Sequence, residues 1–165
     1  MIRRICLLIV LLANLPAITS VFAYSREEQV EVLRGLEGVY VVVGRLKPEI
    51  ERDGLYGTML QDDAEFMLRT AGVKVLSEQE WLLAPGAPYL YLNVDAFKYS
   101  DGYVYKIRLC LVEKVHPVRK PTVIEATTLS MRDDLGITPT LTAIREEARD
   151  LLDKFTEVWR AANPK

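Results

Sequence analysis

The sequence contains few of the residues that form disulfides, metal sites and catalytic triads. Its 165 residues include two cysteines and one histidine. Cys6 lies in an N-terminal segment that we expect to be removed, so Cys110 would have no cysteine left to pair with inside the chain. We predict that Cys110 is a small buried strand residue, since unpaired cysteines are among the most buried side chains. An intermolecular disulfide or a redox site is the alternative.

Sequence motifs for catalysis are also missing. The chain has no glycine-rich phosphate loop, no paired-histidine zinc motif, no G-x-S-x-G elbow and no Cys-x-x-Cys pair. His116 lies six residues from Cys110, which along a strand is about 20 Å and too far for a hydrogen bond. It precedes Pro117, and we interpret it as a loop residue. We therefore predict no catalytic residue, no cofactor and no metal ligand.

Three pairs of adjacent acids are the remaining candidates for chemistry: Asp62 with Asp63, Asp133 with Asp134, and Glu146 with Glu147. The first and third pairs fall in expected helices, where neighbouring side chains point about 100° apart and do not face each other. The second pair falls in an expected turn, which could offer oxygen ligands to calcium. It lacks the further acidic ligands of a calcium loop, so we favour an ordinary acidic turn close to a helix.

The N-terminus has the pattern of an export signal. Arg3 and Arg4 precede an apolar stretch, residues 5–13, and a small residue, Ala23, ends the segment. The apolar stretch is shorter than the about 20 residues that span a bilayer, which disfavours a retained anchor. We predict a cleavable signal peptide over residues 1–23 and a periplasmic or secreted protein.

The rest of the chain, residues 24–165, has the length of one domain. Removing the predicted signal peptide leaves 142 residues, and because that peptide carries two arginines and no acid, 19 basic and 23 acidic residues remain, a net charge of −4. Such a length can bury roughly two thirds of its unfolded surface without disulfides. The acidic balance disfavours nonspecific binding to nucleic acid or anionic membranes, although a local basic patch could exist. We expect no stable membrane insertion after cleavage.

Hydrophobic periodicity predicts an α+β fold. Two capping boxes, at Ser25 and Ser77, open short helices, and a continuous β-branched run over residues 39–43 is typical of a central strand. Residues 47–57 form a charged loop. A helix over residues 58–71 that ends at Gly72 connects the run to a strand at residues 73–76, which predicts a parallel crossover. A long amphipathic helix follows Thr138 and Pro139, which we expect at its N-terminus.

A hairpin over residues 89–114 is the clearest strand signal. One parity is apolar and is expected to face the core, with Leu90, Leu92, Val94 and Ala96 on the first strand and Tyr105, Ile107, Leu109 and Leu111 on the second. Asp101 and Gly102 form the turn, and residues 122–131 supply a third antiparallel strand. The expected architecture is a mixed four- to five-stranded sheet with two main helices packed on one face.

The outward face of this hairpin is the candidate partner-binding site. We expect Tyr89, Tyr91 and Asn93 to stand beside Lys106 and Arg108 of the neighbouring strand, with Cys110 and Lys114 also outward. Tyrosine and arginine are enriched where proteins contact each other. The alternative is a solvated sheet face held by ordinary cross-strand pairs, such as a lysine or arginine with Asp95.

Four segments resemble a family of small exported bacterial proteins of unassigned activity: GLEGVYVVV (35–43), AGVKVL (71–76), PGAPYLYLNV (85–94) and NPK (163–165). The resemblance implies a common fold and export, and it brings no catalytic residues. The order of elements is also similar in topology to small α/β modules of envelope proteins, such as the amino-terminal domain of TolB and the LpoB-type lipoprotein activators. Those modules bind other envelope components, although this chain lacks the lipid anchor of the LpoB group.

The sequence therefore favours a non-enzymatic binding or assembly module of the bacterial cell envelope. It would contact a protein partner through the exposed face of the 89–114 hairpin. Two alternatives stay open. A carboxylate-dependent hydrolase acting on an extracytoplasmic substrate would need a cleft with two facing acids about 5–9.5 Å apart, and a small-ligand carrier would need an apolar pocket between helix and sheet.

Overall fold

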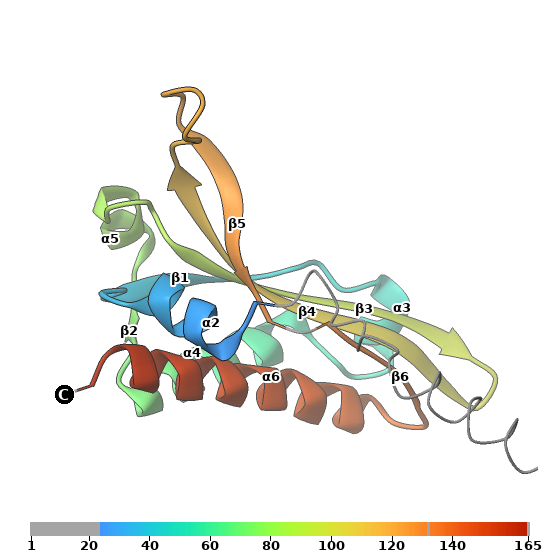
Figure 1. Cartoon of the computed structure of the whole chain (residues 1–165). Coiled ribbons are helices and arrows are strands. Elements are labelled where there is room, and N and C mark those ends of the chain that lie inside the picture. Colours follow the sequence, from blue (N-terminus) through green and yellow to red (C-terminus); the bar gives the residue numbers. More distant parts are fainter. Residues whose placement is uncertain (1–23, 132, 165) are drawn as a thin grey trace, which may run out of the picture.

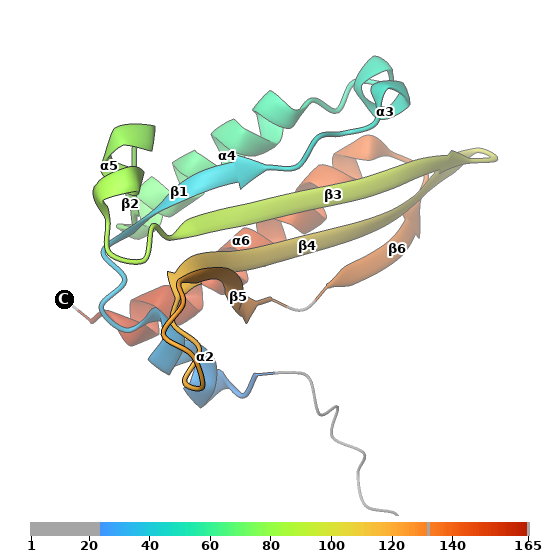
Figure 2. The ribbon, with the colours of Figure 1, turned by 90° about the horizontal axis from the view of Figure 1, so that it is seen from above.

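One face of a mixed β-sheet is covered by helices, and the other face is largely open (Figures 1 and 2). The computed structural model describes residues 24–131 and 133–164, and the predicted signal peptide, residues 1–23, lies outside them. In chain order the elements are α2 (Arg26–Leu33), β1 (Gly38–Val43), α3 (Pro48–Arg52), α4 (Gly57–Ala71), β2 (Lys74–Val75), α5 (Glu78–Leu83), β3 (Tyr89–Tyr99), β4 (Gly102–Val115), β5 (Ile124–Ser130), β6 (Asp134–Thr138) and α6 (Leu141–Ala162). The α+β class predicted from the sequence is confirmed.

The sheet has the order β2-β1-β3-β4-β5, and β6 also pairs with β4. β1 lies between β2 and β3 and is parallel to both, as expected for an interior strand joined to β2 through α4. β3 and β4 form the predicted antiparallel hairpin. β5 pairs with residues 110–115 of β4 and β6 with residues 103–107, so two short strands follow each other along one edge of β4.

Local sequence signals place most helix ends. Both predicted capping boxes form, with the Ser25 and Ser77 hydroxyls accepting from the backbone N–H groups of Glu28 and Glu80. Gly72 ends α4 with a φ of 91°, the left-handed conformation that glycine adopts without a Cβ penalty.

The core lies between the helices and the face of the sheet that we call the inner face. α4 and α6 lie beneath this face in Figure 1, and α2 packs against α6. The predicted inward residues of the hairpin are all buried, and Phe155 of α6 is fully buried beneath them. Arg145 of α6 donates two hydrogen bonds to Asp63 of α4, at 2.6 and 2.9 Å, which joins the two main helices.

Three features differ from the sequence-based expectation. Residues 48–52 of the predicted charged loop form α3, because Pro48 begins the helix with a preset φ and Ile50 is fully buried. Residues 134–138 form the strand β6 instead of a turn, so the sheet has six strands and not four or five. Since β6 extends to Thr138, α6 begins later than expected, and Thr140 caps it by accepting from the Ala143 backbone N–H at 3.3 Å.

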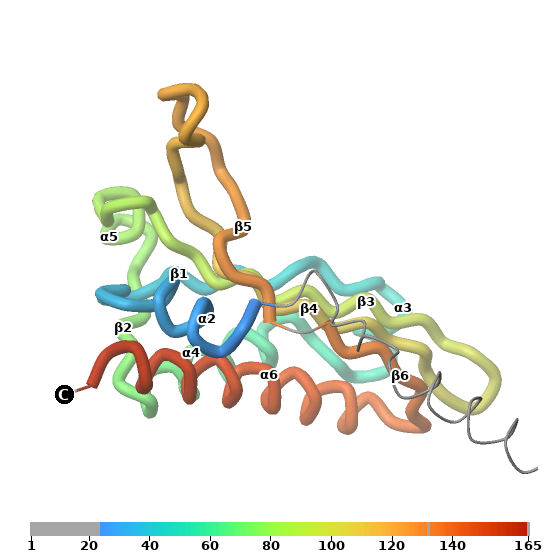
Figure 3. Tube along the Cα trace, viewed as in Figure 1, coloured from blue at the N-terminus to red at the C-terminus, as the bar shows by residue number. Residues whose placement is uncertain are grey.

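The end of β4, the start of β5 and the loop between them project from the sheet on the side opposite α4 and α6 (Figures 1 and 3). We call residues 112–125 the arm. The pairing of β4 with β5 shifts register between Leu111 and Val112, where the arm leaves the sheet. An irregularity of this kind bends and twists the strands that contain it.

Candidate functional site

All five predicted site residues lie on the outer face of the sheet, opposite the inner face. Tyr89, Tyr91 and Asn93 alternate on β3 with buried Leu90 and Leu92. On β4, Lys106 and Arg108 alternate with buried Ile107 and Leu109. In the register of the hairpin Asn93 stands opposite Arg108, Tyr91 opposite Cys110 and Tyr89 opposite Val112. The structure therefore brings Asn93 beside the cations and places Tyr89 four register pairs farther along the hairpin.

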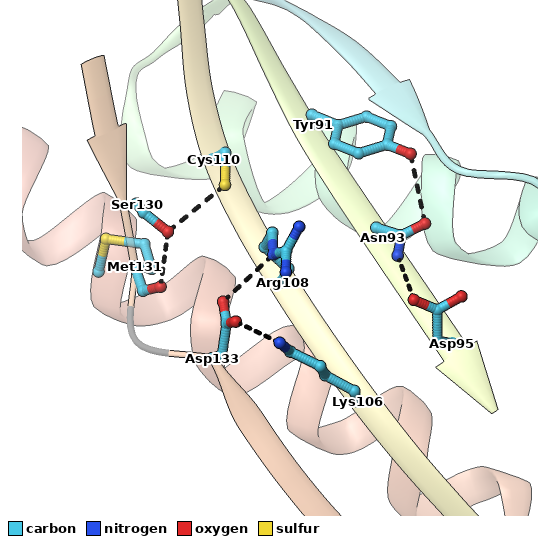
Figure 4. Close-up of polar contacts among 9 residues, drawn as sticks. All are labelled: Tyr91, Asn93, Asp95, Lys106, Arg108, Cys110, Ser130, Met131 and Asp133. Carbon is cyan, nitrogen blue, oxygen red and sulfur yellow. Dashed lines mark hydrogen bonds and ion pairs between the residues drawn. The ribbon is translucent and has the colours of Figure 1, made fainter. Parts of the chain in front are cut away.

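Both cations of the outer face share an acid that the sequence analysis did not connect with them. Lys106 Nζ lies 2.8 Å from Asp133 Oδ2, and Arg108 Nε lies 3.5 Å from Asp133 Oδ1 (Figure 4). The cationic side chains are 43% and 47% exposed, so the shared acid holds them in place without covering them. Asp133 was missed because it lies beyond β5 in the sequence and reaches the face only through the pairing of β6 with β4.

A chain of polar contacts follows β3 beside the cations. The Tyr91 hydroxyl donates to Asn93 Oδ1 at 3.3 Å, and Asn93 Nδ2 donates to Asp95 Oδ2 at 2.9 Å (Figure 4). A side chain at Gly44 would collide with the Asn93 amide and the Tyr91 hydroxyl. The small residue at the end of β1 therefore leaves room for this chain, which fixes the outward tyrosine and amide on the sheet.

Tyr89 belongs to a separate aromatic cluster. Its ring meets Trp81 of α5 edge to face, with 6.0 Å between centroids, and Trp81 stacks on Tyr40 of β1 at 5.2 Å. The Tyr89 hydroxyl donates to Glu125, and this hydrogen bond together with burial raises the pKa of Tyr89 to about 12. Tyr89 thus ties α5, the sheet and the arm together at one end of the outer face.

Cys110 is on the predicted face but is not exposed there. Its side chain is 5% exposed, and its Sγ lies 3.5 Å from the Ser130 hydroxyl of β5 (Figure 4). Cys110 lies on the outward parity, as predicted, and it is covered there because β5 pairs directly beside it where the arm leaves the sheet. The expectation that this thiol is buried is confirmed.

The outer face continues past the cations into a row of apolar side chains. Phe97 of β3, Val104 of β4 and Ile137 of β6 stand in register, and Leu135 of β6 stands opposite Lys106. Phe97, Leu135 and Ile137 are 54%, 76% and 77% exposed. We call these four residues the apolar row. The alternation of Leu135 and Ile137 about Gly136 was the signal for a strand here, and the neighbouring acids and glycine masked it.

A pocket of about 470 Å³ lies at the other end of the sheet, between the α2–β1 loop, β2, α5 and the turn before β3. Its charged wall residues are Arg34, Glu37, Lys74, Glu80 and Glu113. Lys74 pairs with Glu80 at 2.7 Å, and this contact, together with the hydrogen bonds of Ser77, lowers the pKa of Glu80 to about 2. The remaining wall is largely apolar and includes Leu36, Leu76 and Leu83, so the pocket has both charged and apolar sides.

Three of the six adjacent acids form ion pairs with basic side chains of the chain. Asp63 is held by Arg145, and Asp133 is held by Lys106 and Arg108. The expected acidic turn close to a helix is wrong for residues 133–134, because Asp134 begins β6 and turns toward Lys154 of α6, at 3.9 Å. Since Asp133 and Asp134 serve opposite faces of the sheet, they do not converge on one ion.

His116 follows the last residue of β4 and is exposed in the loop of the arm, as predicted. Over residues 24–131 and 133–164, no cluster of three or more histidine, cysteine, aspartate and glutamate side chains could hold a metal ion. None of the helices in that part of the chain is both long enough and apolar enough to cross a membrane. Comparisons of the chain with protein-family models, with curated proteins and with solved structures gave no match.

Proposed function

We propose that this chain is an exported, non-enzymatic binding or assembly module of the bacterial cell envelope. It contacts a protein partner through the outer face of the 89–114 hairpin. The observation that carries the proposal is the apolar row, in which Phe97, Leu135 and Ile137 are exposed beside Lys106 although the apolar side chains of the inner face are buried.

The outer face exposes large apolar side chains to water at Phe97, Leu135 and Ile137. Exposed apolar side chains that stand in register on three adjacent strands form a contiguous patch, and such patches mark contact sites in many proteins. β3 and β4 pair along the whole hairpin, so this surface is already ordered and loses little conformational entropy when a partner binds. Lys106 and Arg108 are already oriented by Asp133, which provides a fixed polar border next to the row.

Site-specific photo-cross-linking in cells that express the chain tests this proposal. A photoreactive phenylalanine analogue in place of Ile137 should capture one defined protein, while the analogue in place of Glu157 on the exposed side of α6 should not. The captured protein is then purified and its affinity for the chain measured. L135E/I137E should weaken that affinity at least tenfold, because it places two charges in a contact that excludes water.

A matched variant separates binding from folding. Phe66 on α4 is 67% exposed, so F66E changes the charge of the helical layer without disturbing the outer face. All these variants should keep the unfolding midpoint of the wild type within a few degrees. Equal loss of affinity in F66E and L135E/I137E, or the same captured protein from position 157, would refute the outer face as the contact.

The pocket favours a second candidate, binding of a small amine that carries an apolar tail. Its charged wall holds Glu37, Glu80 and Glu113 against Arg34 and Lys74, so acids are in excess. Octylamine is a suitable probe. Saturable binding by calorimetry that is lost in E37Q/E113Q supports a ligand site, and identical heats from the two proteins rule it out.

A further inference from the structure

The arm has a charge pattern unlike that of the rest of the chain. Residues 114–124 contain Lys114, Arg119 and Lys120, with His116 and no acid, whereas the whole chain has more acids than bases. All four of these side chains are on exposed residues. The loop projects away from the body of the molecule (Figures 1 and 3), so these basic side chains lie apart from the sheet and the helices.

Apolar side chains sit among these cations at the end of the arm. Val118 is fully exposed, and Val123 and Ile124 are 54% and 43% exposed. Nothing in the described chain packs over Val118, which lies next to Arg119 in sequence. Aliphatic side chains flanked by lysine and arginine are the combination that enters the headgroup region of an anionic membrane.

The backbone of the loop is suited to a surface that is poor in water. Pro117 and Pro121 carry no N–H, and the Lys120 and Thr122 backbone N–H groups donate to the carbonyls of Pro117 and Lys120 at 3.1 and 2.8 Å. Four of the loop positions therefore offer no free backbone donor, which lowers the number of hydrogen bonds lost when the loop leaves bulk water. A loop without such pairing would pay that cost at each exposed N–H.

The base of the arm is fixed and its acids are occupied. Glu125 accepts from the Tyr89 hydroxyl, and Glu113 accepts from the Thr128 hydroxyl at 2.5 Å. These contacts attach the arm to β3 and hold its two strands together. They also keep both carboxylates at the stem, where Lys114 stands in register with Glu125, so the charged residues at the end of the arm are Arg119 and Lys120.

We propose that the arm docks the protein reversibly on the surface of an anionic phospholipid membrane. Arg119 and Lys120 contact lipid phosphates, and Val118 enters the interface beside them. This role is independent of the partner contact proposed for the outer face. A single-stranded nucleic acid is less suited to the loop, because residues 114–124 contain no phenylalanine, tyrosine or tryptophan on which bases stack.

Vesicle sedimentation of the full chain tests the proposal. The chain should bind vesicles of phosphatidylglycerol and phosphatidylcholine more tightly than vesicles of phosphatidylcholine alone, and less tightly as salt is raised. R119Q/K120Q should lower the partition coefficient on the anionic vesicles about 30-fold, which corresponds to about 1 kcal/mol for each basic residue. Residues 1–23 are the same in both proteins, so the comparison isolates the arm.

R149Q/R160Q is the matched control, because it removes two exposed cations from α6 and should leave partitioning within about twofold of the wild type. V118W adds a reporter at the end of the arm. Its fluorescence should shift to shorter wavelength with anionic vesicles and be quenched by brominated lipid.

Three results would overturn the proposal. R119Q/K120Q and R149Q/R160Q could lose the same affinity, V118W could show no shift, or the chain could bind soluble polyglutamate and not vesicles. The last result would identify an acidic polymer as the occupant in place of lipid.

Discussion

Replacement of Gly136 by alanine should destabilise the pairing of β6 with β4. A Cβ at this position would lie 2.5 Å from the Tyr105 hydroxyl oxygen, 2.7 Å from its Cζ and 2.9 Å from its Cε1. Tyr105 is the register partner of Gly136 and is only 8% exposed, so its ring cannot move freely away. Overpacking of this kind costs about 1–3 kcal/mol, and the lower entropy of the unfolded alanine chain offsets about 0.4–1 kcal/mol. The net loss should be about 1–2 kcal/mol.

Urea denaturation measures the free energy of unfolding, and amide hydrogen exchange locates the loss. Exchange should accelerate in β6 more than in β1, since the collision is with the ring of Tyr105 on β4, the strand that pairs with β6. G136A/Y105L should recover at least 1 kcal/mol relative to the sum of the single changes, because leucine lacks the colliding ring atoms. G57A is the control, as a Cβ there meets no atom within 4 Å. Strict additivity of G136A and Y105L would refute the steric argument.

Three shorter predictions follow from burial and charge. F155A should cost about 3–5 kcal/mol in urea denaturation because Phe155 is 0% exposed, and F66A on the exposed side of α4 should cost little. The folded-state pKa of Tyr89 is raised to about 12, so the contribution of its hydrogen bond to Glu125 is complete below about pH 10 and is lost as pH rises through about 12; ultraviolet titration should show one fewer high-pH tyrosine in Y89F. The pKa of Glu80 is lowered to about 2, so the stability difference between wild type and E80Q should be full above pH 4.5 and should vanish as pH falls through about 2.

Local periodicity was enough to predict most of the helices and the hairpin. The alternation in the hairpin placed Leu90 and Leu92 inside, and the amphipathic pattern after Pro139 predicted the long helix α6. These predictions succeed because a strand or helix buries one face, and the spacing of apolar residues reports that face directly. The two capping boxes succeed for a similar reason, since both of their partners lie within four residues.

The missed features depend on contacts between distant segments. β6 is short, begins with an acid and contains Gly136, so its sequence is that of a turn until its pairing with β4 is known. Asp133 reaches Lys106 and Arg108 only through that pairing. The apolar row was missed for the same reason, because Leu135 and Ile137 come together with Phe97 only through the pairing of strands that are far apart in the sequence. A site assembled by sheet register leaves little trace in local composition.

The arm and the outer face have a geometric relation that constrains both proposals. The arm and α5 both rise on the side of the sheet opposite α4 and α6 (Figure 1). A membrane at the end of the arm would therefore face the outer face, and the helical layer would point away. A partner bound by the apolar row would then lie close to the lipid surface, and binding to either would raise the effective concentration of the other. The relation can be tested with single cysteines in place of Leu135 and Glu157, which lie on opposite layers of the molecule. Anionic vesicles should slow the reaction of a water-soluble maleimide at position 135 and leave position 157 unchanged, whereas equal slowing at both positions would contradict this orientation.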